Sequence, residues 1–334
     1  MMRRTMRRKG AAMPFEQFDR SRLHLLPLSE RVHDLDLSVM KDPDVEPSYT
    51  HPTIDILAQK ICEAKEQHAT VLMMMGGHVI RSGVAPCLIR LMKEGYITHF
   101  AFNGATAIHD FEFAMIGATT ESVAKYISEG QFGLWTEDGL YTQALSEGVK
   151  DGLGAGEALG RFIVEHNFPY RQYSLLAACY EQHVPATVHI SIGCDIVHEQ
   201  PNANGADIGQ ATYTDFLIYT HSIENLEHGV FMDFGSAVTG PEVYLKALSM
   251  ARNVAKQEGR QIAHFTTAVF DLLPLEGLDV SETPPKSDPR YYFRPWKTIM
   301  SRTVADGGRS YYVQGRHEDT VQALYWKIRK SQEQ

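Results

Sequence analysis

Residues 71–117 read VLMMMGGHVIRSGVAPCLIRLMKEGYITHFAFNGATAIHDFEFAMIG. A short apolar run, Val71–Met75, ends at Gly76-Gly77, and a second run over residues 97–102 ends at Asn103-Gly104-Ala105. Buried strands that end in glycine-rich turns are where α/β sheets bind nucleotides, because glycine lets backbone N–H groups approach a phosphate or ribose closely. The two turns therefore predict a dinucleotide crevice. Neither turn is a complete G-x-G-x-x-G fingerprint, so turns that merely join strands to helices are the alternative.

The rest of the chain alternates in the same way between apolar runs and longer helix-like segments. Further strands are expected near residues 186–193, 229–234, 262–270 and 310–314, and one helix is expected over 110–129. This alternation predicts a Rossmann-like, doubly wound α/β fold, with a mainly parallel sheet and helices on both faces. No repeat or linker is evident. We expect a single domain over residues 21–334, after a disordered basic extension over residues 1–20.

A second glycine-rich string, GLGAGEALG, occupies residues 152–160. It superficially resembles a nucleotide-binding loop. A dinucleotide loop must follow a strand, however, and no apolar run leads into this one. We therefore interpret it as a turn that leads into a helix.

The composition excludes several classes of function. The formal net charge of −9 over 334 residues, with basic residues clustered only in the first ten, argues against a nucleic-acid partner. Four cysteines without a C-x-x-C pair fit reduced thiols. The basic start is not followed by the apolar region of a secretory signal, and no apolar stretch approaches the ~20 residues of a membrane helix. We expect a cytoplasmic protein without a membrane partner.

Polar residues just past the strand ends should gather at one edge of the sheet. They are Gly77, His78, Asn103, Gly104, His109, Asp110, Asp195, Asp207, Gly235, Ser236 and Thr267. The two aspartates after residue 190 could hold a ribose diol or an ammonium group, or could cap a loop or helix. A metal hydrolase using His189, Cys194 and His198 is a weaker alternative, because the chain has no tight zinc-binding pair such as H-E-x-x-H. We predict no metal.

Lys297 follows Trp296 after a long loop rich in acidic residues. An ammonium group beside an aromatic surface is partly desolvated, which lowers its pKa and favours imine chemistry. The alternative is a surface lysine whose charge simply reaches water.

With these residues in hand, the order of motifs from about Asp55 onward resembles deoxyhypusine synthase and its relatives. Residues 77–83, GHVIRSG, resemble the S-N-L-I-S-S-G turn of that family, and residues 295–297, PWK, resemble its W-G-K element. Residues 103–120 also resemble a string in the NAD-binding ornithine cyclodeaminase domain of LOR/SDH-type proteins. At residues 238–242 the chain reads VTGPE, where deoxyhypusine synthase has V-V-K-H-H.

The resemblance implies an NAD-binding enzyme that oxidises an amine or amino acid to an imine, followed by transfer, cyclisation or hydrolysis. It also implies a homotetramer of paired dimers. A non-catalytic NAD-binding or assembly protein on the same fold is the alternative. The residues that it implies are Lys297, His109 and Trp296 for catalysis; Gly77, His78, Ser82, Asn103, Gly104, Ala105, Asp195, Gly235, Ser236 and Thr267 for NAD; and Asp207 and Asp110 for substrate.

Overall fold

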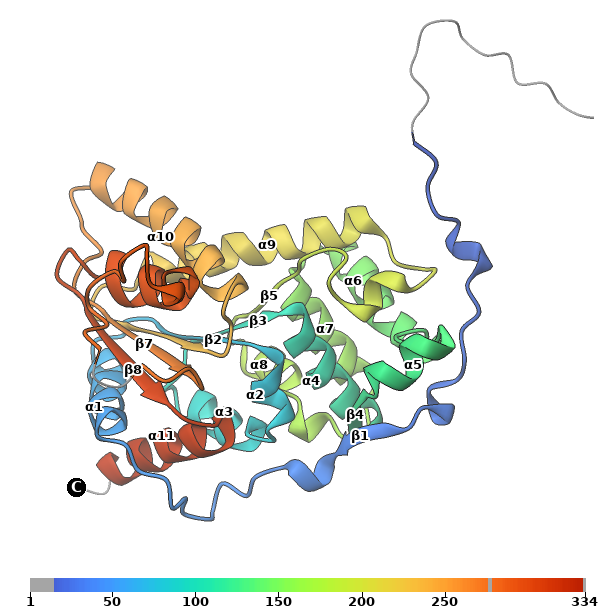
Figure 1. Cartoon of the computed structure of the whole chain (residues 1–334), viewed down its shortest axis with the longest axis horizontal. Coiled ribbons are helices and arrows are strands. Elements are labelled where there is room, and N and C mark those ends of the chain that lie inside the picture. Colours follow the sequence, from blue (N-terminus) through green and yellow to red (C-terminus); the bar gives the residue numbers. More distant parts are fainter. Residues whose placement is uncertain (1–14, 276–277, 333–334) are drawn as a thin grey trace, which may run out of the picture.

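The computed structural model describes residues 15–275 and 278–332. Its centre is a parallel sheet with the strand order β5-β3-β2-β6-β7-β8 (Figure 1). The strands are β2 (Val71–Met75), β3 (His99–Asn103), β5 (Ala186–His189), β6 (Val230–Phe234), β7 (Thr266–Asp271) and β8 (Arg309–Gln314). The chain starts in the middle of the sheet, fills one half outward and then returns to fill the other half. This order confirms the predicted Rossmann-like, doubly wound fold.

Helices cover both faces of the sheet, which is why its strands are apolar on both sides. In β2, Met73 and Met75 face one hydrophobic cluster, while Leu72 and Met74 face the other. The first cluster is covered by α1 (Pro52–Glu66), α3 (Ala85–Lys93), α8 (Leu175–Gln182) and α11 (His317–Gln332). The second is covered by the end of α9 (Gly205–Ile223), by α10 (Thr239–Gln257) and by the π-helix η8 (Trp296–Arg302).

The remaining helices pack beside the half of the sheet that ends at β5 (Figure 1). They are α2 (Gly77–Arg81), α4 (Gly104–Ile116), α5 (Val123–Glu129), α6 (Gly139–Lys150) and α7 (Ala155–Glu165). The predicted helix over 110–129 is wrong. Gly117 ends α4 with a left-handed φ of 69°, and the short strand β4 (Ala118–Glu121) separates α4 from α5.

The glycine-rich string at 152–160 leads into α7, as predicted. Its glycines allow close packing. A Cβ on Gly156 would lie 1.9 Å from the carbonyl oxygen of Ala186, and one on Gly160 would lie 2.4 Å from that of Leu176. The amino end of α7 is already occupied by the protein's own carboxylate, because Gly156 N donates to Asp215 Oδ2 at 2.9 Å. No phosphate site is left there.

Residues 20–50, here called the N-terminal strap, cross the outside of the molecule before α1 begins (Figure 1). Within the strap, β1 (His33–Asp36) pairs antiparallel with β4, with Leu35 opposite Thr119. Further along, the strap packs on Gly83, where a Cβ would lie 2.1 Å from the carbonyl oxygen of Val39. The strap thus adds residues far from β2 in sequence to the surroundings of the first turn.

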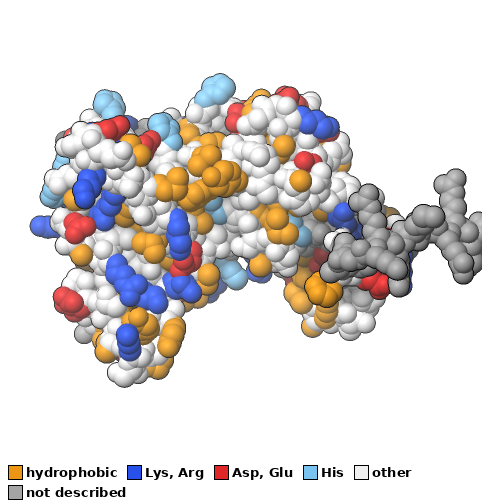
Figure 2. All heavy atoms as spheres, turned by 90° about the horizontal axis from the view of Figure 1, so that it is seen from above, with side chains coloured by type: hydrophobic (Ala, Val, Ile, Leu, Met, Phe, Trp, Pro, Cys, Tyr) orange, Lys and Arg blue, Asp and Glu red, His pale blue; other side chains and the backbone are white. Residues whose placement is uncertain are grey.

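Residues 1–14 of the predicted disordered extension lie outside the described residues. Arg20, at its end, donates to the carbonyl oxygens of Gln200 and Ala203. No helix within the described ranges is long and apolar enough to cross a membrane. Figure 2 shows apolar side chains gathered on the face formed by α9 and α10, where Tyr213, Leu217, Met250 and Val254 are exposed.

Candidate functional site

The carboxyl ends of β2 and β6 form the topological switch point of the sheet, because the chain leaves these neighbouring strands toward opposite faces. In open α/β sheets, ligands bind in the crevice outside such a point. The two strand ends are very close: a Cβ on Gly76 would lie 2.3 Å from the carbonyl oxygen of Gly235. Gly235 itself has a left-handed φ of 62°. Both positions therefore require glycine.

A cavity of 870 Å³ opens on the β6–β8 side of the switch point and is here called the wide cavity. It is lined by Leu35, Val39, Lys41, His78, Arg81, Ser82, Gly235, Asp271, Leu272, Arg316, His317 and Glu318. Three of these residues, His78, Ser82 and Gly235, were predicted to bind the cofactor. The cationic side chains at its wall are suited to a ligand that carries phosphate.

A smaller cavity of 230 Å³, here called the charged pocket, opens on the side of β3 and β5. It is lined by Arg31, Arg81, Ala105, Ile108, His109, Glu112, Thr120, Glu121, Val123, Phe132, Cys194, Asp195 and Ile196. Arg81 lines both cavities, so they meet at the end of α2. The pocket presents both cations and carboxylates, the combination that a zwitterion requires.

His109, on α4, lines the charged pocket. Its Nδ1 is 2.8 Å from Thr119 Oγ1. A Cβ on Gly77 would lie 3.3 Å from its Nε2. Burial lowers the pKa of His109 to about 4, against the opposing effect of Glu112, so the imidazole is neutral near pH 7.

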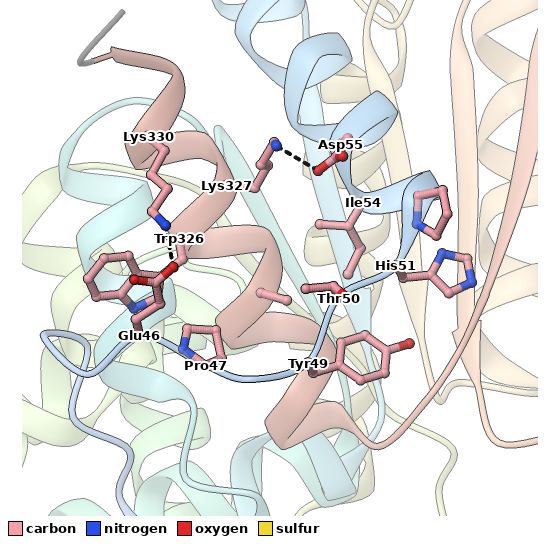
Figure 3. Close-up of a pocket in the computed structure, with 12 residues that line it drawn as sticks. Glu46, Pro47, Tyr49, Thr50, His51, Ile54, Asp55, Trp326, Lys327 and Lys330 are labelled. Carbon is pink, nitrogen blue, oxygen red and sulfur yellow. Dashed lines mark hydrogen bonds and ion pairs between the residues drawn. The ribbon is translucent and has the colours of Figure 1, made fainter.

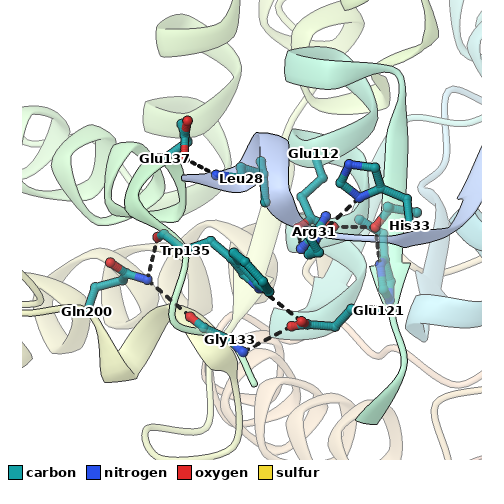
Figure 4. A network of polar contacts seen from close by, with 11 residues as sticks. Leu28, Arg31, His33, Glu112, Glu121, Gly133, Trp135, Glu137 and Gln200 are labelled. Carbon is teal, nitrogen blue, oxygen red and sulfur yellow. Dashed lines mark hydrogen bonds and ion pairs between the residues drawn. The ribbon is translucent and has the colours of Figure 1, made fainter. Parts of the chain in front are cut away.

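A buried polar network supports this wall of the pocket (Figure 4). Arg31 Nη1 pairs with Glu112 Oε1 at 2.6 Å, and both side chains are almost fully buried. Thr119 Oγ1 donates to the other oxygen of Glu112. Glu121 accepts from the indole N–H of Trp135 at 2.9 Å. An ion pair buried this deeply must be closely matched, because an unpaired charge would be costly there.

Asp195 follows β5 and rests on the start of α4. A Cβ on Gly104 would lie 1.9 Å from Asp195 Oδ2, so only glycine allows the carboxyl group to approach the helix terminus. Burial raises the pKa of Asp195 to about 6. The carboxylate is thus ionised at neutral pH but poorly solvated, which favours a cationic ligand beside it.

Three donors on residues that line the pocket have no partner within the described part of the chain. Arg31 Nη2, Arg81 Nε and Thr120 Oγ1 are buried and make no hydrogen bond there. Thr120 also has a left-handed φ of 69°. A β-branched residue in that conformation carries about 1–3 kcal/mol of strain, which typically persists where function requires it.

The structure brings together Gly77, His78, Ser82, Gly104, Ala105, His109, Asp195 and Gly235 of the predicted site residues. Asn103 and Ser236 flank this group as caps: Asn103 Oδ1 accepts from Thr106 N at 2.9 Å, and Ser236 Oγ accepts from Gly240 N at 2.9 Å.

Thr267 is placed elsewhere, and the prediction that it ends its strand is wrong. β7 begins at Thr266, so Thr267 lies at the amino end of the strand, whereas the crevice lies at the carboxyl ends. Its hydroxyl is 2.5 Å from Ser310 Oγ. Asp271 is the β7 residue that reaches the wide cavity.

Two predicted substrate residues have other partners and line neither cavity. Asp110 is fully buried and caps α8, accepting from Leu175 N at 2.7 Å and from Ser174 Oγ at 2.5 Å. Asp207 accepts from Ser146 Oγ at 2.6 Å. The geometry favours a capping role for Asp110 over contact with substrate.

The Trp296-Lys297 pair lies on η8, beside the cluster that packs under α10. Trp296 is buried and its indole N–H donates to the carbonyl oxygen of Glu282 at 2.9 Å. The Lys297 ammonium lies 4.5 Å from the centre of the Tyr291 ring. Neither residue lines the wide cavity or the charged pocket.

No group of three or more His, Cys, Asp or Glu side chains in residues 15–275 and 278–332 is arranged to hold a metal ion. The residues of the metal alternative are otherwise engaged. His189 Nε2 contacts Thr187 Oγ1 at 3.1 Å, and His198 Nδ1 accepts from Asp195 N at 3.2 Å.

A further cavity of 400 Å³ lies between the end of the N-terminal strap and α11 (Figure 3). Its lysines are neutralised: Lys327 pairs with Asp55 at 2.9 Å, and Lys330 pairs with Glu46. The pair with Glu46 fastens the strap to the last helix and the pair with Asp55 fastens α1 to it, and we assign the cavity no ligand.

Four residues that line the two cavities were not predicted as site residues: Arg31, Arg81, Glu112 and Arg316. Arg81 could have been found, because it lies in the glycine turn GGHVIRSG itself. Arg31 and Glu112 carried no such signal, since 81 positions separate them in the chain.

The strand order, the paired glycine turns and the crevice define a Rossmann-type fold. A family profile described as arginine dihydrolase ArgZ-like, C-terminal, Rossmann fold matches residues 55–131, which contain both glycine turns. No curated protein sequence matches the chain.

Solved structures share this fold at low sequence identity. ArgZ, an arginine dihydrolase from the ornithine–ammonia cycle in cyanobacteria, is 15% identical over 84% of this chain and 31% of its own, with a TM-score of 0.50. A cysteine-to-alanine mutant of AgrE in complex with L-arginine is 14% identical over 86% of this chain and 34% of its own, with a TM-score of 0.50. AgrE has also been solved in a ternary complex with ornithine and NAD+, which aligns with a TM-score of 0.47.

A LOR/SDH protein from Methanococcus maripaludis is 14% identical over 87% of this chain and 74% of its own, with a TM-score of 0.49. This chain spans about a third of the length of ArgZ and AgrE. At these identities the alignments with ArgZ and AgrE establish a shared fold.

Proposed function

We propose that the chain is an NAD-dependent enzyme that oxidises a small amino acid to an imine. The observation that carries this proposal is the charged pocket, which offers donors without a partner in the described residues and a poorly solvated carboxylate, and which meets the wide cavity at Arg81. The likeness to AgrE supports the class of ligand, since that protein has been solved with L-arginine.

The crevice fits a dinucleotide on three counts. It lies at the switch point of the sheet, as expected for such cofactors. Glycine at positions 76 and 235 keeps the two strand ends free of side chains. Lys41 and Arg316 line the wide cavity, where Lys41 and the part of the Arg316 guanidinium that does not pair with Glu318 Oε1 can contact phosphate groups. When bound, NAD+ supplies the acceptor for a hydride.

The chain's own residues would then bind and deprotonate the substrate. The Nε–H of Arg81 has no partner among residues 15–275 and 278–332 and can donate to the α-carboxylate. Asp195 can accept from the ammonium group, which relieves its poor solvation. The neutral His109 imidazole can accept a hydrogen bond from the same ammonium group at Nε2, and Asp195, which has the higher pKa of the two, can take the proton that the ammonium loses.

The proposal extends to the reaction that consumes the imine. Hydrolysis, cyclisation and transfer to an acceptor each follow from imine chemistry, and the resemblance to deoxyhypusine synthase keeps an amine such as spermidine among the candidate substrates. A role for Lys297 as an imine-forming amine also stays a prediction. A non-catalytic NAD-binding protein is the alternative reading of the same crevice.

Calorimetric titration with NAD+, followed by spectroscopic detection of NADH with a panel of amino acids and spermidine, tests the proposal. We expect binding and turnover of at least one basic amino acid. Arg81→Gln should lose most of the substrate affinity. Arg90→Gln is the matched control, because Arg90 pairs with Asp44 outside both cavities. Absence of NAD+ binding would refute the cofactor; binding without turnover on any substrate would favour the non-catalytic alternative.

Assembly into paired dimers remains part of the proposal. The exposed apolar side chains on α9 and α10 provide one face that a second copy could cover (Figure 2). Sedimentation of the native chain and of a Leu217→Glu variant tests it, since a charge at that interface would reduce the particle mass.

A further inference from the structure

The imidazole of His109 has two different environments. Its Nδ1 contacts Thr119 Oγ1 at 2.8 Å on the buried side of α4. Its Nε2 lies beside Gly77 on the pocket side and has no hydrogen-bond partner among the described residues. A neutral imidazole has one N–H and one lone pair, so the position of the proton decides whether the pocket receives a donor or a base.

A chain of hydrogen bonds runs from His109 Nδ1 into the protein through three further side chains. Thr119 Oγ1 bonds to Glu112 Oε2, and Glu112 Oε1 pairs with Arg31 Nη1 at 2.6 Å. The residues come from three elements: α4 carries Glu112, β4 carries Thr119 and the N-terminal strap carries Arg31. The pairing of β1 with β4 holds the strap in place beside this wall (Figure 4).

The direction of each hydrogen bond follows from the charges. Arginine remains protonated in proteins, so Arg31 donates to Glu112, and a carboxylate in a buried ion pair is an acceptor only. The single hydroxyl proton of Thr119 therefore points to Glu112. Its oxygen must then accept from Nδ1–H of His109. The lone pair is left on Nε2.

A second carboxyl group belongs to the same buried cluster. Burial, together with the charge of Glu112, raises the pKa of Asp138 well above its usual value, and Asp138 Oδ2 has no partner in the described structure. Arg31 pairs with Glu112 at 2.6 Å, and its charge opposes the rise in the pKa of Asp138.

We propose that Thr119, Glu112 and Arg31 are positioning residues that fix His109 in its Nδ1-protonated form and aim the basic Nε2 into the charged pocket. The use of that base on an amino acid rests on the proposed function. The orientation of the proton does not, because it follows from the contacts of the chain alone.

Long-range 1H–15N NMR of the native chain, labelled with 15N-histidine, reads the position of the proton directly. The His109 signals are identified by their loss in a His109→Asn variant. We expect an N–H type signal from Nδ1 and an unprotonated signal from Nε2. The opposite pattern in the native chain would overturn the proposal without any variant.

Two variants at position 119 then separate the hydroxyl group from the space that it fills. Thr119→Val keeps the shape but removes the acceptor, so we expect the Nδ1–H signal to be lost in favour of Nε2–H. Thr119→Ser restores the hydroxyl and should restore the native pattern. An unchanged pattern in Thr119→Val would contradict the relay.

The charge of Glu112 is tested by titrating the same signals. Charged or titratable groups on three elements act on His109: Glu112 from α4, Arg81 and His78 from α2, and Arg31 from the strap. Glu112 raises the pKa of His109, whereas the other three groups lower it. Glu112→Gln should therefore lower the pKa of His109 from its native value of about 4.

Glu137→Gln is the matched control for Glu112→Gln, because Glu137 holds the same strap through Leu28 N at 2.7 Å but lies outside the relay. The two variants should differ in the titration of His109. An equal change in both would show that loosening of the strap, and not the charge of Glu112, is responsible. Turnover is not needed for any of these readouts, so a failure of the proposed function leaves them decisive.

Discussion

The chain contains two glycine-rich regions that look alike in sequence but differ in structure: one lies where two cavities open, and the other allows close packing of a helix. The turns at 76–83 and 103–105 lie at carboxyl ends of parallel strands, where two cavities open. The string at 152–160 starts α7 and presses it against β5 and α8. In both regions a Cβ would collide with a backbone carbonyl group. Glycine content alone therefore does not mark a binding site.

The difference lies in the position of each region in the sheet. At the start of α7, Asp215 accepts from Gly156 N and from Val188 N at 2.6 Å, so the helix terminus is filled by the protein itself. The start of α4 also has a carboxyl group of the protein beside it, that of Asp195. At the switch point, however, Gly76 and Gly235 pack against each other at the carboxyl ends of β2 and β6, where the wide cavity opens.

The largest expected effect is on stability at α7. Gly156→Ala places a Cβ 1.9 Å from the carbonyl oxygen of Ala186, a backbone atom that cannot rotate away. We expect a loss of about 3 kcal/mol in the free energy of unfolding, measured in urea. NAD+ affinity of the folded fraction should be unchanged. If the loss of NAD+ binding free energy exceeded the loss of unfolding free energy, the 152–160 string would contribute to binding and the two regions would not differ in function.

The second effect is on binding at the switch point. Gly76→Ala places a Cβ 2.3 Å from the carbonyl oxygen of Gly235, so the ends of β2 and β6 must separate. We expect NAD+ affinity to fall at least tenfold, or about 1.4 kcal/mol, by calorimetry. If Gly76→Ala kept the native affinity for NAD+, the cofactor would not bind at the switch point.

The third effect depends on pH and concerns Asp195. Its folded pKa of about 6 lies above the ordinary 3.8, so its contribution to stability is full at low pH and is lost as the pH rises through 6. Asp195→Asn has no carboxyl group to ionise at this position, so the variant should not lose this stability as the pH rises. At pH 7.5 we expect the free energy of unfolding to rise by roughly 1–2 kcal/mol, while amino-acid affinity falls.

The native chain provides the control for this prediction. Its urea midpoint should decrease between pH 4 and pH 6 more steeply than that of the variant. If the urea midpoints of the native chain and the variant change equally with pH, the ionised Asp195 carboxylate does not destabilise the fold. Its proposed contact with an ammonium group would then lose its support.

The smallest effect belongs to a glycine with no close neighbour. Gly209 lies inside α9, and a Cβ there would meet nothing within 4 Å. Gly209→Ala should stabilise the chain by about 0.5–1 kcal/mol through helix propensity, with no change in NAD+ affinity. Thermal unfolding and calorimetry of this variant set the baseline against which both glycine regions are compared.

The sheet was predictable because its strands are buried on both faces. Val71–Met75 is wholly apolar and Val230–Phe234 is apolar except for Asp233. Both runs are short and end at glycine, which in an alternating chain indicates a parallel sheet. The boundaries were less predictable. The interruption of the 110–129 helix depends on the pairing of β4 with β1, a strand about 85 positions earlier, which no local pattern indicates.

The site divides in the same way. Gly77, His78 and Gly235 could be predicted, since each follows a buried strand directly. Thr267 was misplaced: it lies inside the strand expected near 262–270, and because pairing with β6 and β8 begins at Thr266, it falls at the amino end of that strand.

The amino-acid sequence by itself determined the parallel α/β architecture and the glycine turns at its switch point, because burial and backbone sterics act between neighbours in the chain. Only the tertiary structure decided which charges meet. Arg31 reaches Glu112 across 81 positions, and Asp195 rests on Gly104, because strand pairing and helix packing bring them together. A buried charge acquires its role from its partners, and those partners are distant in sequence.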